Sequence, residues 1–191
     1  MRKIMACGLA ELGRADQVPQ EAPEQLAEYG RLLLEQNQVM NLTAITQPEE
    51  VVEKHFVDSL TLLAWPKLKQ GAKVIDVGTG AGFPGMVLKV LEPTIELTLL
   101  DSLKKRMDWL GQVLPQLEIE AQCVSARAEE YALEHREQYD IAVSRAVARL
   151  TMLAELCLPL VRVGGQFIAM KSADSDEEIS QAAHAISLLG G

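Results

Sequence analysis

An acid and a series of glycines, spaced as in a ligand-binding loop, stand in the stretch KVIDVGTGAGFPG, residues 73–85. Asp76 lies in the apolar part of this stretch, and glycines follow it at every second position from Gly78 to Gly82. Glycine lets the backbone adopt left-handed conformations and lets a ligand approach the main chain closely. Pro84 is suited to the first turn of a helix. The stretch therefore predicts a buried strand, a loop that binds a ligand through its backbone, and a helix.

Three ligands use glycine loops of this kind: a phosphate, a dinucleotide and S-adenosylmethionine. A phosphate-binding P-loop requires Lys and then Ser or Thr after its last glycine, but Met86 and Val87 stand there. The dinucleotide pattern G-x-G-x-x-G can be matched by starting at Gly80, but its first glycine belongs at the end of the strand. Counted from Gly78, which has that place, the sixth position is the bulky Phe83, where helix and strand must pack closely. Both patterns therefore fit poorly.

The remaining pattern, an acid on the strand followed by G-x-G-x-G, resembles the first motif of the Rossmann-like S-adenosylmethionine-dependent methyltransferases. Asp101 ends the next apolar run, where its carboxylate can accept hydrogen bonds from both hydroxyls of a ribose. No nearby arginine calls for a 2′-phosphate. S-adenosylmethionine and NAD share this ribose, so the glycine spacing, not Asp101, favours the former. A purely structural turn is the alternative interpretation.

The elements that would position these residues alternate along the chain. Strands are expected at 73–77, 95–100, 119–124, 140–144 and 166–170, and helices at 83–91, 102–115 and 149–158, with a less regular helical segment at 125–138. This alternation, with nearly continuous apolar strands, is typical of a doubly wound α/β fold with a mostly parallel sheet. Ligands of such sheets bind beyond the carboxyl ends of the strands.

Residues 1–70 have helical patterns without strands. One helix is expected at 24–40, because four of its apolar or aromatic residues fall close to one helical face: Leu26, Tyr29, Leu33 and Met40. A second helix is expected to begin at Thr46, the first residue of a capping-box pattern, and to end at Trp65 before a proline. We therefore expect a helical N-terminal cap over 1–70 and a ligand-binding domain over 71–191, joined in one compact unit.

The net charge of −9 argues against a nucleic-acid partner, but the excess of acids lies in residues 1–50 and 172–191. A basic face in the central region therefore stays open. Aromatic residues make up only 4% of the chain, so no stacking platform for bases is evident. Three widely spaced cysteines favour neither a disulfide framework nor a metal site and indicate a reducing cytoplasm. No apolar run has the length of a membrane span, and the short one near the N-terminus lacks a cleavage-like site.

The residues after the fourth expected strand bear on the methyl acceptor. The segment VSRAVARL, residues 143–150, contains neither the Pro-Pro of adenine-type amino methyltransferases nor the cysteine of cytosine-C5 enzymes. Guanine N7 already has a free lone pair, so methyl transfer to it requires alignment rather than a general base. The segment is consistent with N7 chemistry, and we expect no catalytic acid or base.

A series of motifs in collinear order resembles the RsmG/GidB family of bacterial 16S rRNA (guanine-N7) methyltransferases. The motifs are NLTAIT (41–46), HFVDSL (55–60), IDVGTGAGFPG (75–85), LLDSLKKRMDWL (99–110), SARAEEY (125–131), SRAVARL (144–150) and AMKS (169–172). The resemblance implies a methyltransferase that binds S-adenosylmethionine and acts on 16S rRNA. It also implies cofactor contacts at Gly78, Phe83, Ala128, Glu129 and Arg145, to which the spacing adds Gly80 and Asp101. For Glu129, the first turn of an exposed helix is the alternative interpretation.

Several cations are candidates for the RNA. Arg145 and Lys171 end two adjacent strands, where they could hold a phosphate or the target guanine, or could be ordinary surface cations. Lys105 and Arg106 open a helix at the same rim, where they could contact the RNA or could simply be solvated. His55 is expected to meet Asp58 three residues on, and the resemblance places this pair beside the cofactor pocket.

Two further expectations concern the whole chain. Methyltransferase sheets of this class have seven strands, whereas this sequence ends after a helix expected at 175–189, so the last two strands are expected to be missing. We expect a monomer that acts on 16S rRNA within a small ribosomal subunit or its precursor, without a metal. The rival interpretations are a small-molecule methyltransferase of the same fold and a non-catalytic, cofactor-binding ribosome-assembly factor.

Overall fold

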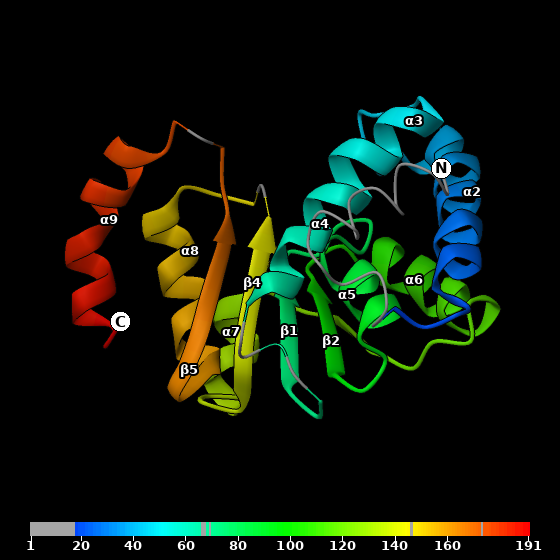
Figure 1. Ribbon diagram of the computed structural model, residues 1–191. Coiled ribbons are helices and arrows are strands. Elements are labelled where there is room, and N and C mark those ends of the chain that lie inside the picture. The colour runs from blue at the N-terminus through cyan, green and yellow to red at the C-terminus, as the bar shows by residue number, and fades with distance from the viewer. Residues whose placement is uncertain (1–17, 66–67, 69, 146, 173) are drawn as a thin grey trace.

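A five-stranded parallel sheet forms the centre of the molecule (Figure 1). The computed structural model describes residues 18–191 except 66–67, 69, 146 and 173. The strands are β1 (Lys73–Val77), β2 (Glu96–Asp101), β3 (Gln122–Ser125), β4 (Tyr139–Arg145) and β5 (Val161–Met170), in the order β3-β2-β1-β4-β5. All pairs are parallel, so every strand ends at the same edge of the sheet. This confirms the expected α/β fold.

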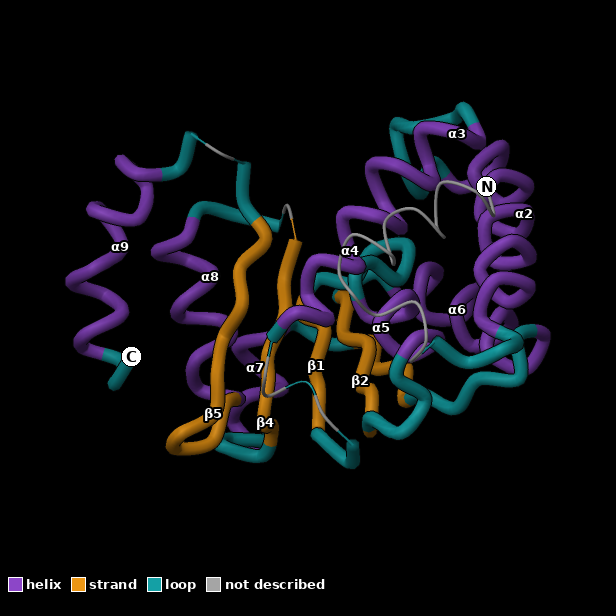
Figure 2. The backbone as a smooth tube through the Cα atoms, in the orientation of Figure 1, coloured by secondary structure: helices purple, strands orange, loops and turns teal. Residues whose placement is uncertain are grey.

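Helices cover both faces of the sheet (Figure 2). The helices that follow the strands are α5 (Gly85–Leu91), α6 (Lys104–Gln116), α7 (Ala128–Glu134), α8 (Leu150–Cys157) and α9 (Asp176–Leu188). On one face, apolar strand residues such as Val74 and Leu97 pack in a cluster with residues of α5 and α6. On the other face, Ile75 and Leu100 pack in a cluster with residues of α7 and α8. The alternation along each strand thus buries both of its faces.

The N-terminal helices lie over the first of these faces, beside α5 and α6, and we call residues 22–64 the cap (Figure 1). The cap consists of α2 (Ala22–Met40), α3 (Pro48–Val51), the π-helix η2 (Val52–Val57), α4 (Asp58–Leu60) and the 3-10 helix η3 (Thr61–Ala64). Leu26, Tyr29 and Leu33 of α2 are fully buried, as the helical pattern predicts. The domain division near residue 70 stays a prediction.

The second cap helix begins differently from the expectation. Its N-cap is Gln47, with no side-chain capping bond, so the expected capping box at Thr46 is wrong. Pro48 explains the shift, because the residue before a proline is biased to the extended conformation that Gln47 adopts. The helix also passes through a π-helical segment before it ends at Ala64.

The fifth strand begins at Val161, before the expected range of 166–170. The third strand also differs from the expectation. It runs from Gln122 to Ser125 rather than over 119–124. Ile119 is instead used at the end of α6, where its N–H bonds to the carbonyl of Leu114 and its side chain is buried. The apolar run at 119–124 therefore includes the close of a helix as well as a strand.

Candidate functional site

The carboxyl ends of β1, β2 and β4 surround a cavity of about 830 Å³, and residues of the cap line one side of it. Every residue that the sequence indicates as a cofactor contact lines this cavity: Gly78, Gly80, Phe83, Asp101, Ala128, Glu129 and Arg145. Since these residues come from four parts of the sequence, the fold brings the expected set together. We call this space the first cavity.

The glycine loop forms one wall of the first cavity through its backbone. Gly78, Gly80 and Gly82 have φ angles of 72°, 61° and 93°, in the left-handed region that favours glycine. Gly82 is also tightly enclosed, because a Cβ there would lie 2.6 Å from Cγ of Met86 and would contact the hydroxyl of Tyr29. Backbone conformation and close packing thus both require glycine here.

Asp76 holds the glycine loop in place through hydrogen bonds, a role that the sequence pattern did not assign to it. Its buried Oδ2 accepts hydrogen bonds from the Thr79 hydroxyl at 2.7 Å and from the Gly85 N–H at 2.8 Å, so it joins the start of the loop to the start of α5. Oδ1 is buried without a hydrogen-bond partner among the described residues. Burial raises the pKa of Asp76 to about 6, although the hydrogen bonds from Thr79 and Gly85 oppose this shift.

Asp101 lies on the same wall, at the end of β2. Its Oδ2 accepts a hydrogen bond from the Gly80 N–H at 3.0 Å, and its Oδ1 accepts one from the Leu103 N–H at 2.8 Å. Arg106 reaches the same carboxylate, with 3.2 Å between Nη1 and Oδ2. The expectation that no arginine stands near Asp101 is therefore wrong. A carboxylate has about four acceptor positions, so Asp101 can hold the loop and still accept a hydrogen bond from a ligand.

Ala128 and Glu129, at the start of α7, border the cavity beyond the third strand. Glu129 is exposed, and its Oε1 lies 2.5 Å from Nε of Arg127. Hydrogen bonds from its own backbone N–H and from Arg127 hold the pKa of Glu129 below its ordinary value. The side chain is thus an anion at the rim, consistent with both interpretations made from the sequence.

Arg145 forms the opposite wall by joining the end of β4 to the cap. Its guanidinium donates to Nδ1 of His55 at 2.9 Å, to Oδ2 of Asp58 at 3.3 Å and to the carbonyl of Lys54 at 3.1 Å. The same group lies 5.2 Å from the ring centre of Phe83. His55 and Asp58, expected to meet directly, are thus connected through Arg145.

His55 is held as a neutral imidazole in this network. Burial and the neighbouring Arg145 lower its pKa to about 4. A guanidinium can only donate, so Nδ1 accepts from Arg145 and the ring proton lies on Nε2, 2.9 Å from Oγ1 of Thr43. The ring stacks on Phe83 with 4.6 Å between centroids. Both nitrogens are therefore engaged within the protein.

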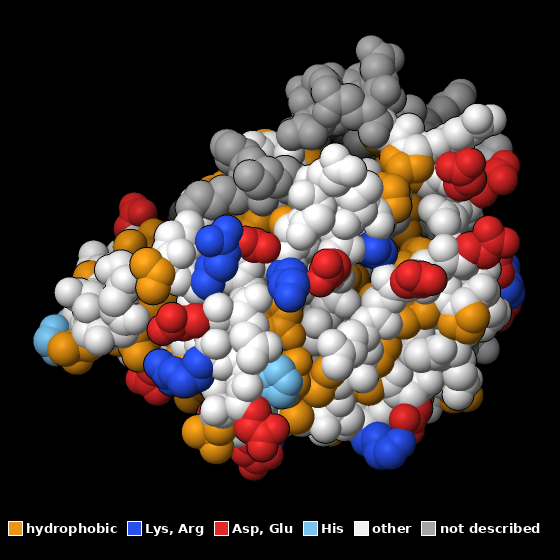
Figure 3. Space-filling model, turned by 90° about the horizontal axis from the view of Figure 1, so that it is seen from below, with side chains coloured by type: hydrophobic (Ala, Val, Ile, Leu, Met, Phe, Trp, Pro, Cys, Tyr) orange, Lys and Arg blue, Asp and Glu red, His pale blue; other side chains and the backbone are white. Residues whose placement is uncertain are grey.

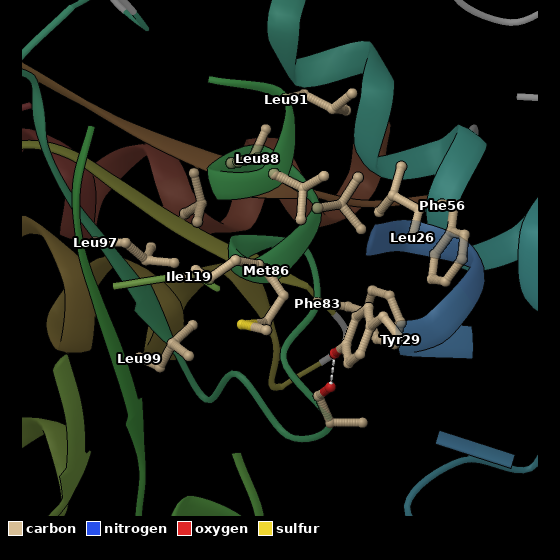
Figure 4. Close-up of a cluster of buried hydrophobic side chains, with 14 of the residues drawn as sticks. Leu26, Tyr29, Phe56, Phe83, Met86, Leu88, Leu91, Leu97, Leu99 and Ile119 are labelled. Carbon is tan, nitrogen blue, oxygen red and sulfur yellow. Dashed lines mark hydrogen bonds between the residues drawn. The ribbon is translucent and has the colours of Figure 1, made fainter. Parts of the chain in front are cut away.

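A group of aromatic side chains connects the cap to the glycine loop, and the sequence patterns did not reveal it. Tyr29 packs 5.4 Å from Phe83 and 5.9 Å from Phe56, measured between ring centroids, and Figure 4 shows these rings together in the buried cluster. The Tyr29 hydroxyl donates a hydrogen bond to the carbonyl of Ala81 in the loop. The helical pattern predicted Tyr29 as a core residue, but not this bond across 52 positions of sequence.

Comparison with solved structures places the fold among methyltransferases. A SAM-dependent O-methyltransferase from Thermotoga maritima aligns with a TM-score of 0.57, 15% identity, and 82% of this chain and 55% of that chain covered. A precorrin-6y C5,15-methyltransferase from Geobacter metallireducens aligns with a TM-score of 0.53, 16% identity, and 76% and 72% covered. At such identities the likeness concerns the fold alone.

Comparison of sequences identifies the family. The family model GidB, described as rRNA small subunit methyltransferase G, matches residues 22–191. The chain belongs to the GidB family. It is 50% identical over 193 residues to a ribosomal RNA small subunit methyltransferase G of Alkaliphilus metalliredigens, with 100% of this chain and 80% of the relative covered. A protein of the same name from Clostridium botulinum (strain ATCC 19397 / Type A) is 48% identical over 170 residues, with 87% and 71% covered.

Within this GidB fold, the cations expected to bind substrate are not equivalent. Lys171 donates to Oε1 of Glu178 at 2.8 Å and to the carbonyl of Ala148 at 2.7 Å, so it joins β5 to α9 and to the segment before α8. Arg106 lines the first cavity but is paired with Asp101, whereas Lys105 is exposed and lies outside the cavity lining. Of these cations, only Arg145 lies where the cap and the glycine loop meet.

No group of three or more His, Cys, Asp or Glu side chains in residues 18–191, gaps excepted, is arranged to hold a metal ion. No helix in this part of the chain has the length and apolar character of a membrane span.

Proposed function

We propose that the chain transfers a methyl group from S-adenosylmethionine to N7 of a guanine in 16S ribosomal RNA. One observation carries the proposal: the first cavity has a backbone wall made by the glycine loop and Asp101, and a side-chain wall made by Arg145 and the cap. The first wall suits a nucleoside cofactor, and the second stands where an acceptor base would approach it. Membership of the GidB family supports this assignment.

The residues of the backbone wall fit the cofactor. Asp101 keeps acceptor capacity for ribose hydroxyls while it holds the Gly80 N–H, and the glycines present no side chain to the ligand. Ala128 and Glu129 line the same cavity and would contact the adenine. When bound, the cofactor supplies a methyl group on a sulfonium, and the electron pair of the broken C–S bond stays on sulfur as the acceptor forms its new bond to carbon.

The chain's own residues contribute positioning rather than proton transfer. Guanine N7 attacks through a lone pair and loses no proton, so a general base has no task. His55 agrees with this role, because it is neutral and both its nitrogens are occupied. Arg145 would instead hold Asp58 and the cap in position beside the acceptor.

Incubation with methyl-labelled S-adenosylmethionine and bulk RNA from cells that lack the enzyme tests the proposal. We expect label in a single guanosine of 16S rRNA, recovered as 7-methylguanosine after digestion. Transfer to a small molecule alone, or cofactor binding without transfer to any RNA, would contradict it.

The substrate is expected to be a particle rather than naked RNA. The protein carries a net charge of −9, and Lys171 and Arg106, two cations of the rim, are already paired. Acidic and basic side chains are also interspersed on the face seen in Figure 3, at the amino ends of the strands, so this face offers no continuous basic surface. Few phosphates can then be neutralised, and affinity for isolated RNA should be weak.

Initial rates decide between the two substrates. We expect small ribosomal subunits from cells lacking the enzyme to be methylated faster than deproteinised 16S RNA, by a protein that sediments as a monomer and acts in the cytoplasm. Equal or faster methylation of the naked RNA would contradict this part of the proposal.

A further inference from the structure

A second cavity of about 530 Å³ adjoins the first, between the end of the cap and the carboxyl end of β5. The two cavities share Asp58 and Arg145 as lining residues. Trp65, directly after the cap, and Met170, at the end of β5, line only the second one. Its volume is within the range of about 300–1,000 Å³ that is usual for small-molecule sites. A group bound there would lie beside a ligand of the first cavity.

The lining of the second cavity suits a base better than a phosphate. Both of its cations are engaged: Arg145 donates to Asp58 and His55, and Lys171 donates to Glu178. Asp58 adds a carboxylate that would repel a phosphate. Trp65 is 41% exposed and offers an aromatic surface. Aromatic surfaces of this kind hold unstacked bases.

Asp58 has an acceptor to spare. Its side chain is 49% exposed, and Oδ2 accepts from Arg145 at 3.3 Å. None of the described residues donates a hydrogen bond to Oδ1, and the side chain is half exposed, so a ligand donor can reach this oxygen. The contact with Arg145 fixes the direction of the carboxylate. The cavity therefore presents an oriented anion next to an aromatic ring.

We propose that the second cavity receives the target guanine, with Asp58 as the residue that selects guanine by accepting from its N1–H and N2 amino group. Guanine alone among the four RNA bases carries two adjacent donors that match a carboxylate. Adenine and cytosine place a ring acceptor beside their amino group, and uracil has one donor. Contact at the N1–N2 edge leaves N7, on the opposite edge, with its lone pair free. This inference rests on the proposed function.

Inosine, which lacks the N2 amino group, provides the test. Small subunits are reconstituted with guanosine or inosine at the mapped nucleotide, and kcat/KM is measured for wild type, Asp58→Asn and Glu53→Gln. Glu53 is an exposed acid of the same cap segment that lines neither cavity, so its variant makes the same change in charge elsewhere. We expect wild type and Glu53→Gln to prefer guanosine by about tenfold or more, and Asp58→Asn to lose most of this preference.

A second pair of variants tests the aromatic surface. Trp65→Ala should raise KM for the subunit by about fivefold or more, whereas Trp65→Phe should restore most of the affinity, since base stacking tolerates any aromatic ring. A guanosine-to-inosine ratio in Asp58→Asn equal to that of wild type would overturn the inference and leave the proposed function standing. Absence of any guanosine methylation by wild type would instead remove the proposed function itself.

Discussion

The two walls of the first cavity are built in different ways. The glycine-loop wall is local: Asp76, Thr79 and Gly85 are bonded within ten residues, and Asp101 reaches the loop from the neighbouring strand. The cap wall depends on contacts between distant segments, because Arg145 meets His55 across 90 positions of sequence. The first wall consists of backbone held by carboxylates, and the second of side chains held by one another.

This difference indicates that the two walls have different roles, one toward the cofactor and the other toward the acceptor. A backbone wall offers fixed groups to a cofactor that is the same in every reaction cycle. A side-chain wall, in which Arg145 fixes the direction of the Asp58 carboxylate, faces an acceptor that must be selected. Phe83 joins them, since it belongs to the glycine loop and packs against both His55 and Arg145.

The largest effect is expected when a glycine of the backbone wall is replaced by alanine. Gly82→Ala adds a Cβ in a left-handed conformation against Met86 and Tyr29. We expect a loss of about 2–5 kcal/mol in the free energy of unfolding, measured with urea, together with loss of cofactor binding. Gly71→Ala is the matched control: its φ of 73° is also left-handed, but its Cβ would meet nothing within 4 Å, so only strain of about 1–2 kcal/mol is expected. Equal losses for the two variants would contradict close packing at Gly82.

The next effect concerns the cap wall. Arg145→Ala removes three hydrogen bonds to the cap and the contact with Phe83, so we expect methylation to fall by about 100-fold, equivalent to about 3 kcal/mol. Arg145→Lys should recover little, because an ammonium cannot form the fork. Arg149→Ala, an exposed arginine bonded to Gln181, serves as the control. A fully active Arg145→Ala would show that the cap wall has no part in the reaction.

The pH dependence of the free energy of unfolding tests the burial of the Asp76 carboxylate in the backbone wall. The pKa of Asp76 is raised to about 6 in the folded protein, so between about pH 4 and pH 6 the folded state holds a proton that the unfolded chain releases. The stability of wild type relative to Asp76→Asn should therefore fall as pH rises through this window, by about 2–3 kcal/mol. His55, with its lowered pKa, contributes in the opposite direction, but it is present in both proteins and cancels. A difference that is constant with pH would contradict the burial of an ionisable Asp76.

The smallest effect concerns the bond between the two walls. Tyr29→Phe removes the hydroxyl that donates to Ala81, so we expect a loss of about 1 kcal/mol in unfolding free energy and weaker cofactor binding. Tyr131→Phe removes a buried hydroxyl bonded to Tyr139 on the other face of the sheet and should cost similar stability without affecting the cofactor. Cofactor affinity that is unchanged in Tyr29→Phe would mean that the cap does not support the loop.

The sequence predicts the backbone wall well because its signals are local. The acid, the glycine spacing and the strand-end Asp101 all lie within about thirty residues, and parallel strand ends must meet at one edge. Two element boundaries differ from the prediction: the run at 119–124 contains Ile119, which closes α6, and Pro48 places the N-cap of the second helix at Gln47 instead of Thr46.

The cap wall could be predicted only in part, since nothing local shows which distant groups meet. His55 and Asp58 line the first cavity, but the guanidinium that joins them comes from β4, far away in the sequence. Lys171 resembled Arg145 as a cation at a strand end, yet Glu178 of the following helix pairs with it. The helical periodicity places Tyr29 on the apolar face of its helix, but nothing in this pattern indicates the hydrogen bond from its hydroxyl to the carbonyl of Ala81.

Calorimetric titration of S-adenosylmethionine into Asp101→Ala and Asp58→Asn tests the division between the walls most directly. We expect Asp101→Ala to weaken binding by about 1.5–3 kcal/mol, the range for hydrogen bonds to a charged group, and Asp58→Asn to change it by less than about 0.5 kcal/mol. NAD should not bind measurably to wild type. Equal losses in the two variants, or an unchanged affinity in Asp101→Ala, would contradict a cofactor held by the backbone wall and an acceptor held by the cap.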